Sequence, residues 1–418
     1  MKVLWFSPVI LPDIAKQCGL SVPASGGWIE GMASQIVGFN EIELTICFCT
    51  LSANKFTGAT DQYQYFGYPV HSSIVAFQDY IEKIKPDIVH IFGTENENSN
   101  SIIKACETLG LQDYTVINVQ GIVSVISKHF TAFLPNSVIY GASLRDILKH
   151  NNVFLENKKY ERRGLYEIDT IKRAHHIIGR TEWDKVCIFR INSEINYYHN
   201  NESLRSVFYE NEWNEHKCER YSIFVSQCSY PLKGFHLMLE AMADVKKKFP
   251  SAKLYVTGND PISAPFRERL KQTKYMKYIV HLIKRYNLTD TVVFCGKLSA
   301  EQMCDRYLKS NVFVCCSTIE NSSNSVGEAM LLGVPVVASD VGGIKSLLED
   351  NKEGLLYQAD APYMLANCIC KIFEDSHFTR ELSANARIRA SITHDRDNNR
   401  NCLLNIYKSI YSGKGKYL

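Results

Sequence analysis

The sequence has little net charge and no long apolar run. Its 47 Lys and Arg residues against 44 Asp and Glu residues leave a formal charge of +3, which is too small for a general polyanion binder, so we do not expect nucleic acid as a partner. No stretch approaches the ~18 apolar residues that cross a bilayer, and the apolar run at the start of the sequence is too short for a signal peptide. We therefore expect a protein that is neither secreted nor membrane-spanning.

Disulfide and zinc frameworks are not indicated by the cysteines. The 14 cysteines are sparse in 418 residues and none lies in C-x-x-C spacing, which argues against both. Several occur in apolar runs such as Val312–Cys316, where a thiol serves as a small hydrophobic group in a reducing compartment. This usage predicts a cytoplasmic protein.

Short β-branched and aromatic segments alternate with longer amphipathic ones, which is typical of an α/β fold with parallel strands joined by crossover helices. The alternation of strands and helices begins again after Arg220, and 418 residues are more than a single hydrophobic core usually contains. We therefore predict two doubly wound domains, at 1–214 and 215–400, joined by the polar segment Tyr197–Arg220, with a helix in 401–418 that crosses back to the first domain. The predicted strands are Lys2–Ser7, Glu43–Thr50, Ile88–Ile91, Thr115–Val119, His176–Gly179, Ser222–Ser226, Lys253–Thr257, Val292–Cys295, Val312–Cys316 and Pro335–Ala338.

The most informative segment runs from Glu320 to Gly343, after a predicted strand and into a predicted helix. Small polar residues at the helix start, Asn324 and Ser325, would leave backbone N–H groups able to hold a diphosphate. Glu320 and Glu328 bracket this position, and carboxylates can accept hydrogen bonds from sugar and ribose hydroxyls. The alternative is that Ser325-x-x-Glu328 is an ordinary capping box without a ligand. The residues alone leave both interpretations open.

The spacing Glu320-x7-Glu328, followed by Gly333-Val-Pro335 and Asp340-Val-Gly-Gly343, resembles the retaining glycosyltransferases of family 4. That resemblance implies the GT-B fold, in which a first Rossmann-like domain binds the acceptor and a second binds the nucleotide-sugar donor across a cleft. It also implies that Glu320 lies by the donor sugar, that Glu328 holds the ribose, and that the loop reaching Val326 cradles the diphosphate of a UDP or GDP sugar. No cofactor and no metal ion are expected.

Two cations bind the donor phosphates in the family, and this sequence matches one of them. Lys233 matches the lysine, whereas Gln227 stands where an arginine is usual. The loss of one cation matters, because charge stabilisation of this kind is often worth several kcal/mol in a transition state. Arg180 is a candidate replacement, although a structural arginine paired with Glu182 or Asp184 is the preferred interpretation.

The first domain resembles the family mainly at its strand ends. Gln120 stands where many relatives have a histidine near the reacting sugar; it cannot act as a base, but its amide can hydrogen-bond the donor sugar. Gly26 and Gly27 resemble the family's glycine-rich loop, with a plain turn as the alternative. His129 is a candidate acceptor contact, and Gly258 closes a second-domain strand near the expected nucleotide. The buried core is the preferred place for His90.

The resemblance implies a retaining, metal-independent hexosyltransferase that acts on a glycan or lipid-linked acceptor in bacterial surface polysaccharide synthesis. Such acceptors lie at the inner membrane, so the protein would associate peripherally with its cytoplasmic face. The segment His129–Lys149 is either an interfacial surface or ordinary core. The alternative function is a catalytically weak or inactive homologue that binds a sugar nucleotide or scaffolds a partner, motivated by Gln227 and Gln120.

Overall fold

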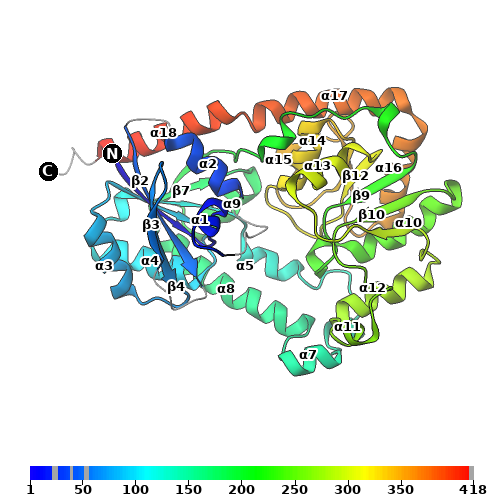
Figure 1. Cartoon of the computed structure of the whole chain (residues 1–418), viewed down its shortest axis with the longest axis horizontal. Coiled ribbons are helices and arrows are strands. Elements are labelled where there is room, and N and C mark those ends of the chain that lie inside the picture. Colours follow the sequence, from blue (N-terminus) through cyan, green and yellow to red (C-terminus); the bar gives the residue numbers. More distant parts are fainter. Residues whose placement is uncertain (21–26, 38–40, 51–55, 414–418) are drawn as a thin grey trace. The chain divides into compact units, whose positions relative to one another are not determined.

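The computed structural model describes residues 1–20, 27–37, 41–50 and 56–413, and the chain forms two compact units (Figure 1). Unit 1 comprises Met1–Val125, Glu161–Arg205 and His394–Leu418, and unit 2 comprises Ile126–Tyr160 and Ser206–Thr393. The sequence placed one boundary near residue 215. The units are interleaved instead, because residues 126–160 pack with the later part of the chain.

Unit 1 contains an eight-stranded sheet with the order β3-β4-β2-β1-β5-β6-β7-β8, in which all neighbours are parallel except β3 and β4. The strands Ile88–Phe92 and Thr115–Asn118 are buried over their whole length and mostly apolar, as expected of a parallel sheet covered on both faces. The strands are β1 (Lys2–Ser7), β2 (Glu43–Thr50), β3 (Thr57–Ala59), β4 (Gln64–Pro69), β5 (Ile88–Phe92), β6 (Thr115–Asn118), β7 (His176–Gly179) and β8 (Asn196–His199).

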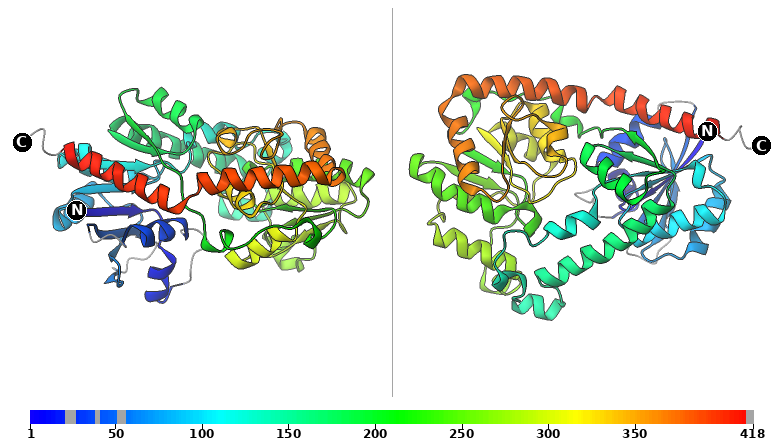
Figure 2. Two further views of the ribbon diagram at one scale, coloured as in Figure 1. Left: turned by 90° about the horizontal axis from the view of Figure 1, so that it is seen from above. Right: turned by 180° about the vertical axis from the view of Figure 1, so that it is seen from behind.

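The helices of unit 1 include the last helix of the described chain, α18 (Arg396–Ser412). Tyr407 of α18 is buried and accepts a hydrogen bond from Trp5 Nε1 at 2.9 Å, and its hydroxyl lies 2.5 Å from Nδ1 of His90. Both views of Figure 2 place the end of α18 beside the N-terminal strand. The predicted return of this helix is confirmed, and His90 lies in the core. The other helices that lie in or begin in unit 1 are α1 (Pro12–Gln17), α2 (Gly27–Val37), α3 (Ile74–Ile84), α4 (Glu97–Thr108), α5 (Val123–Ile126) and α9 (Glu182–Ile191).

Unit 2 contains a six-stranded, all-parallel sheet with the order β11-β10-β9-β12-β13-β14. The strands are β9 (Ser222–Val225), β10 (Lys253–Val256), β11 (Val292–Phe294), β12 (Val312–Cys315), β13 (Val336–Ser339) and β14 (Leu355–Tyr357). Its helices, with α8 continuing into unit 1, are α6 (Asn136–Ile139), α7 (Leu144–Lys149), α8 (Val153–Arg173), α10 (Phe235–Lys248), α11 (Phe266–Leu270), α12 (Lys274–Arg285), α13 (Ala300–Leu308), α14 (Asn324–Leu332), α15 (Ile344–Leu347), α16 (Pro362–Glu374) and α17 (Ser376–Thr393).

The predicted α/β class and the doubly wound sheets are confirmed, and the predicted strands lie within one or two residues of observed ones. The expected connection Tyr197–Arg220 is wrong at its start. Asn196–His199 forms β8, which pairs in parallel with His176–Gly179 at the edge of the sheet. Among the described residues, no helix is long and apolar enough to cross a bilayer.

Candidate functional site

The strand order of unit 2 defines where a ligand is expected. From β9 the chain moves outward to β10 and β11, then returns to the other side of β9 with β12. In open α/β sheets, ligands bind outside the carboxyl ends of the strands at such a reversal. The loops that follow β9 and β12 meet there, and they carry Lys233 and Glu320 respectively.

Hydrogen bonds to the backbone of the β9 loop hold these two loops together. Thr318 N donates to Leu232 O at 2.8 Å, and Cys316 Sγ donates to Lys233 O at 3.2 Å. Gly234 has φ +65°, and a Cβ there would lie 1.7 Å from Cys316 O. A glycine is therefore required where the β9 loop passes the β12 loop, and this close passage brings Lys233 to Glu320.

Lys233 and Glu320 form an ion pair between Nζ and Oε1, and Ser317 Oγ donates to the same carboxylate oxygen at 2.8 Å. Burial by itself lowers the pKa of Lys233, but the Glu320 carboxylate outweighs it and raises that pKa above its ordinary value. The lysine is therefore charged at neutral pH. The side chains remain 25% and 14% exposed, so a ligand can still reach one cation and one carboxylate.

The backbone of Glu320 is fixed by the glycines of the Asp340–Gly343 motif. Gly343 N donates to Glu320 O at 3.0 Å. Gly342 has φ +52°, and a Cβ there would lie 2.0 Å from Glu320 O. The sequence analysis quoted these glycines only as part of a family pattern. Their physical role is to let the chain pass directly against the carbonyl of Glu320.

Helix α14 begins four residues after Glu320, and its N-cap is Ser323, whose side chain makes no capping hydrogen bond within the described chain. Ser325 lies inside the first turn, where its carbonyl accepts from Tyr307 Oη at 3.1 Å. The capping-box interpretation of Ser325 and Glu328 is therefore wrong, since Ser325 is not the N-cap. The first N–H groups of an α-helix have no partner within the helix and favour an anion.

Asn324, Ser325 and Val326 form this first turn, and Glu328 follows one turn later. Val326 and Glu328 are buried, the latter with 5% exposure. The predicted loop and both carboxylates thus lie on one continuous segment at the carboxyl end of β12, as the sequence placed them.

Two further predicted donor contacts follow β9 and β10. Gln227 lies after β9, and its Nε2 donates to Ser229 Oγ at 3.3 Å. Gly258 has φ +122° and exchanges two backbone hydrogen bonds with Gly296, at 2.8 and 3.1 Å. Gln227 supplies amide hydrogen bonds at this edge of the sheet but no positive charge.

The predicted residues Gln120 and Arg180 belong to a buried cluster in unit 1. Arg180 Nη1 pairs with Glu202 Oε2 at 2.9 Å, and these side chains are 3% and 2% exposed. Gln120 Nε2 donates to Glu202 Oε1 at 2.9 Å, while the backbone carbonyl of Gln120 accepts from Arg180 Nη2 at 3.2 Å. The arginine is therefore paired with Glu202, and the expected pairing of its guanidinium with Glu182 or Asp184 is wrong; Asp184 instead accepts the backbone N–H of residue 180.

Two further predicted contacts, His129 and Gly27, lie apart from this cluster, and a third is outside the described residues. His129 is in unit 2, where its carbonyl accepts from Thr318 Oγ1 at 3.1 Å; burial, with the nearby Lys128 charge, lowers the pKa of its imidazole. Gly27 is the first residue of α2, and Gly26 lies outside the described residues.

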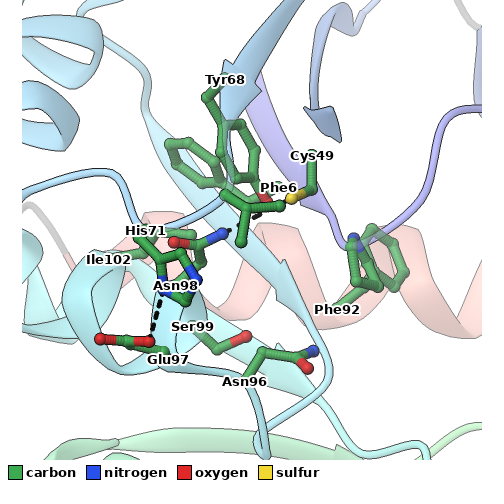
Figure 3. A pocket seen from close by; sticks show the side chains of 12 residues that line it. Phe6, Cys49, Tyr68, His71, Phe92, Asn96, Glu97, Asn98, Ser99 and Ile102 are labelled. Carbon is green, nitrogen blue, oxygen red and sulfur yellow. Dashed lines mark hydrogen bonds and ion pairs between the residues drawn. The ribbon is translucent and has the colours of Figure 1, made fainter. Parts of the chain in front are cut away.

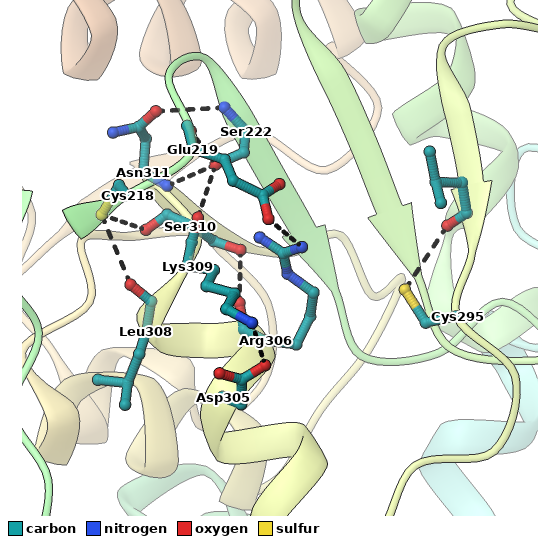
Figure 4. Close-up of polar contacts among 11 residues, drawn as sticks. Cys218, Glu219, Ser222, Cys295, Asp305, Arg306, Leu308, Lys309, Ser310 and Asn311 are labelled. Atoms are coloured by element: carbon teal, nitrogen blue, oxygen red, sulfur yellow. Dashed lines mark hydrogen bonds and ion pairs between the residues drawn. The ribbon is translucent and has the colours of Figure 1, made fainter.

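Unit 1 also holds a cavity of about 250 Å³ that the sequence did not indicate (Figure 3). It lies at the reversal between β1 and β5, with Phe6, Tyr68 and Phe92 on its apolar side. Its polar side comes from the start of α4, where the Glu97 carboxylate lies 2.7 Å from Nδ1 of His71. Aromatic and polar groups face each other here, and the signal missed in the sequence is the polar run Asn96–Ser99 after β5.

A metal ion would need several ligating side chains close together. No set of three or more His, Cys, Asp or Glu residues in the described ranges is placed to hold an ion. The sequence contains one Asp-x-Asp, Asp395 and Asp397, at the start of α18. Asp395 accepts from Asn398 N at 2.7 Å as the helix cap, and Asp397 pairs with Arg400. Metal independence stays a prediction.

Residues 208–389, which include Lys233, Glu320 and α14, match the family model of glycosyl transferases group 1. Unit 2 contains a group 1 glycosyltransferase domain. The chain is 26% identical over 190 residues to an uncharacterized glycosyltransferase of Methanocaldococcus jannaschii, covering 46% of this chain and 45% of the relative. It spans less than half the length of the curated relatives that it matches.

Solved structures share the fold of nearly the whole chain. Sucrose-phosphate synthase from Thermosynechococcus elongatus has a TM-score of 0.73 at 16% identity, covering 99% of this chain and 100% of the other. Anabaena HepE in complex with UDP has a TM-score of 0.68 at 16% identity, covering 98% and 100%. The chain has the GT-B fold.

Proposed function

We propose that this chain is a retaining glycosyltransferase that transfers a hexose from a nucleoside diphosphate sugar to a glycan or lipid-linked acceptor. The observation that carries the proposal is the Lys233–Glu320 pair beside the start of α14, at the strand reversal of a group 1 domain. A UDP sugar is the preferred donor, because the similar HepE structure holds UDP; a GDP sugar is the alternative.

In the proposed reaction, the donor diphosphate lies against Lys233 and the first turn of α14, which carry positive charge and partial positive charge respectively. Lys233 Nζ turns from Glu320 to the phosphate, and the freed Glu320 carboxylate accepts hydrogen bonds from hexose hydroxyls. Glu328 holds the ribose. Gly258 and Gln227 contact the nucleotide side of the site.

The chemical step breaks the bond between the hexose anomeric carbon and the β-phosphate oxygen and forms a bond from that carbon to the acceptor oxygen. The acceptor proton passes to the departing phosphate, on the same face as the bond that forms, so the configuration is retained. No side chain has to act as a base, which suits Gln120. The protein supplies position and charge, without a metal ion or cofactor.

The unit 1 cavity supports an acceptor role for that unit. Aromatic walls with a facing carboxylate, imidazole and amides suit a polyhydroxylated ligand, which needs both apolar contact and hydrogen bonds. A lipid-linked acceptor would bring the enzyme to the cytoplasmic face of a membrane, and surface polysaccharide synthesis is the proposed setting.

A catalytically weak homologue is the second candidate, and two observations favour it. Gln227 supplies no positive charge, and Arg180 is neutralised by Glu202 in a buried pair. If no other cation meets the leaving diphosphate, turnover is slow even though nucleotide binds.

Binding and transfer are tested separately. Thermal unfolding with UDP, GDP, ADP and TDP should show a rise with one of them, because a ligand of the native state stabilises it by mass action. Glu320→Ala should remain folded and lose sugar transfer, whereas the matched control Glu349→Ala, at a 68% exposed side chain, should keep both its fold and its transfer rate. The anomeric configuration of the product, read by proton NMR, decides retention.

The outcomes separate the two candidates. A folded protein that binds none of the nucleotides refutes the donor site. Nucleotide binding without transfer to any glycan or lipid-linked acceptor supports the weak homologue. Transfer by Glu320→Ala at the wild-type rate refutes the role of that carboxylate.

A further inference from the structure

Helix α7 has its polarity reversed relative to an ordinary surface helix. Leu144, Ile147 and Leu148 are 51%, 59% and 71% exposed. The buried residue of this six-residue helix is Asp146, whose side chain is 1% exposed. Apolar side chains normally face the core and charged ones face water, so a cause for the reversal is needed.

The cause is a set of hydrogen bonds that hold Asp146 inward. Its Oδ2 accepts from Ser143 N at 2.9 Å, which completes a capping box at the start of α7. The same oxygen accepts from Lys274 N at 2.7 Å, in the first turn of α12. With Asp146 fixed between two helix starts, the opposite side of α7 with its leucines and isoleucine must face outward.

Helix α11 ends four residues before Lys274, whose N–H donates to Asp146 of α7, and Figure 1 draws the two helices near each other within unit 2. Phe266 and Leu270 are 68% and 39% exposed, and none of the residues of α11, all of them described, is buried. Tyr140, between α6 and α7, is 64% exposed. We name Tyr140, Leu144, Ile147, Leu148, Phe266 and Leu270 the α7–α11 surface. Exposed apolar residues gathered on neighbouring elements mark an interaction site more often than scattered ones do.

The positive charge around the α7–α11 surface indicates which kind of partner it binds. Residues 136–160 and 262–278 contain nine Lys and Arg against three Asp and Glu, a net charge of +6, whereas the whole chain has +3. The remainder is therefore net negative. Lys149, Arg267 and Lys271 are exposed in or directly beside the two helices. An exposed apolar surface bordered by Lys and Arg residues is complementary to an anionic lipid bilayer. Its apolar side chains can enter the bilayer interface, and its cations can contact the lipid headgroups.

We propose that the α7–α11 surface docks this protein on an anionic lipid bilayer. Phe130 and Leu134, earlier in the same segment, are 2% and 8% exposed and do not take part, whereas Phe133 between them is 48% exposed. The segment His129–Lys149, which the sequence left open between core and interface, therefore contains core residues and exposed ones at its start, and its exposed apolar residues continue into α7. This docking surface would explain how the proposed transferase reaches a lipid-linked acceptor, so its biological role rests on the proposed function. Lipid binding itself requires no sugar transfer.

The test is co-sedimentation of the full chain with vesicles, without nucleotide. Phosphatidylcholine vesicles are compared with vesicles in which a quarter of the lipid is phosphatidylglycerol. The affinity calculated from the bound fraction should be at least about tenfold higher for the anionic vesicles, and added salt should lower that affinity. The variant Leu144→Ser/Ile147→Ser/Leu148→Ser should lose at least tenfold in vesicle affinity.

A matched control separates docking from general loss of apolar surface. Val186→Ser/Ile388→Ser/Ile392→Ser changes three residues that are 59%, 61% and 68% exposed on other helices, and it should keep wild-type vesicle binding. The charge variant Lys149→Glu/Arg267→Glu should lose the preference for anionic lipid. Circular dichroism and thermal unfolding show that each variant is folded.

The proposal is overturned if folded wild-type protein ignores anionic vesicles, or if the serine variant at α7 binds them as the control does. A shift from dimer to monomer in that variant, seen by analytical ultracentrifugation, would instead identify a second copy of the chain as the occupant. Nucleotide binding measured on the same samples keeps this outcome distinct from failure of the proposed transferase activity.

Discussion

Gly342→Ala tests whether the glycine motif positions Glu320. The new Cβ would lie 2.0 Å from Glu320 O, at a residue with φ +52°. A Cβ needs at least about 3 Å from a carbonyl oxygen, so the Glu320 backbone or the glycine loop must move by about 1 Å. A displacement of that size near reacting groups costs about 100-fold in rate. We therefore expect transfer to fall by about two orders of magnitude.

The stability change should be much smaller than the change in activity. A left-handed non-glycine residue costs roughly 1–2 kcal/mol, and loop movement relieves the contact with Glu320. Gly110→Ala is the matched control, because Gly110 has φ +68° but a Cβ there would meet no atom of the described chain within 4 Å. Gly110→Ala should therefore show the stability cost of a left-handed alanine without any displacement of Glu320.

The assay is initial transfer rate together with denaturant unfolding for both variants. Gly110→Ala should lose about 1 kcal/mol of unfolding free energy and keep its rate. Transfer by Gly342→Ala within twofold of wild type would refute the argument that this contact sets the position of Glu320. A loss of folding in Gly342→Ala would be visible in the unfolding curve, and Gly343, whose N–H donates to Glu320 O, then offers a second substitution by alanine.

The other predictions concern charge and pH. Glu328→Gln should weaken nucleotide binding by about tenfold, since a hydrogen bond to a carboxylate contributes about 1.5 kcal/mol; an unchanged dissociation constant by calorimetry would contradict the ribose contact. Glu202→Gln leaves the buried Arg180 without its carboxylate and should lower the unfolding free energy by about 3–5 kcal/mol, whereas exposed Glu182→Gln should change it little. Burial lowers the pKa of His90 to about 3, so its neutral form belongs to the folded state; this contribution is complete above the unfolded pKa of about 6.5 and is lost as the pH falls toward 3. His90→Gln should therefore lose less unfolding free energy than wild type between pH 7 and pH 4, and parallel losses would count against the assignment.

Local patterns predicted the strands well because a parallel sheet buries continuous apolar segments. The bounds of β1, β2 and β7 agree with the predicted ones. The strand β4 (Gln64–Pro69) was missed, since its Gly67 and terminal proline are typical of turns. Gly67 occupies that position because a Cβ would lie 3.3 Å from the ring of Phe48, a contact between strands that no local pattern contains.

In the candidate site, too, the sequence predicted some features and missed others. Lys233 and Glu320 were predicted from the family resemblance, and the structure brings them together through Gly234 and Gly342. Glu202 was not predicted as the partner of Arg180, because the two are 22 positions apart and their contact depends on where the chain goes after β8. The sequence could name the charged residues but not which carboxylate each cation meets inside the fold.

The hydrogen bonds of Tyr407 have a consequence for biosynthesis. Unit 1 begins with the first strand, yet Trp5 and His90 find their buried partner in α18. While the ribosome is still translating unit 2, the nascent unit 1 therefore exposes a seam of its core that residues 396–412 will later fill. Completion of the first unit must wait for nearly the whole chain to emerge, so a stalled or shortened translation product would present this apolar seam to chaperones and proteases.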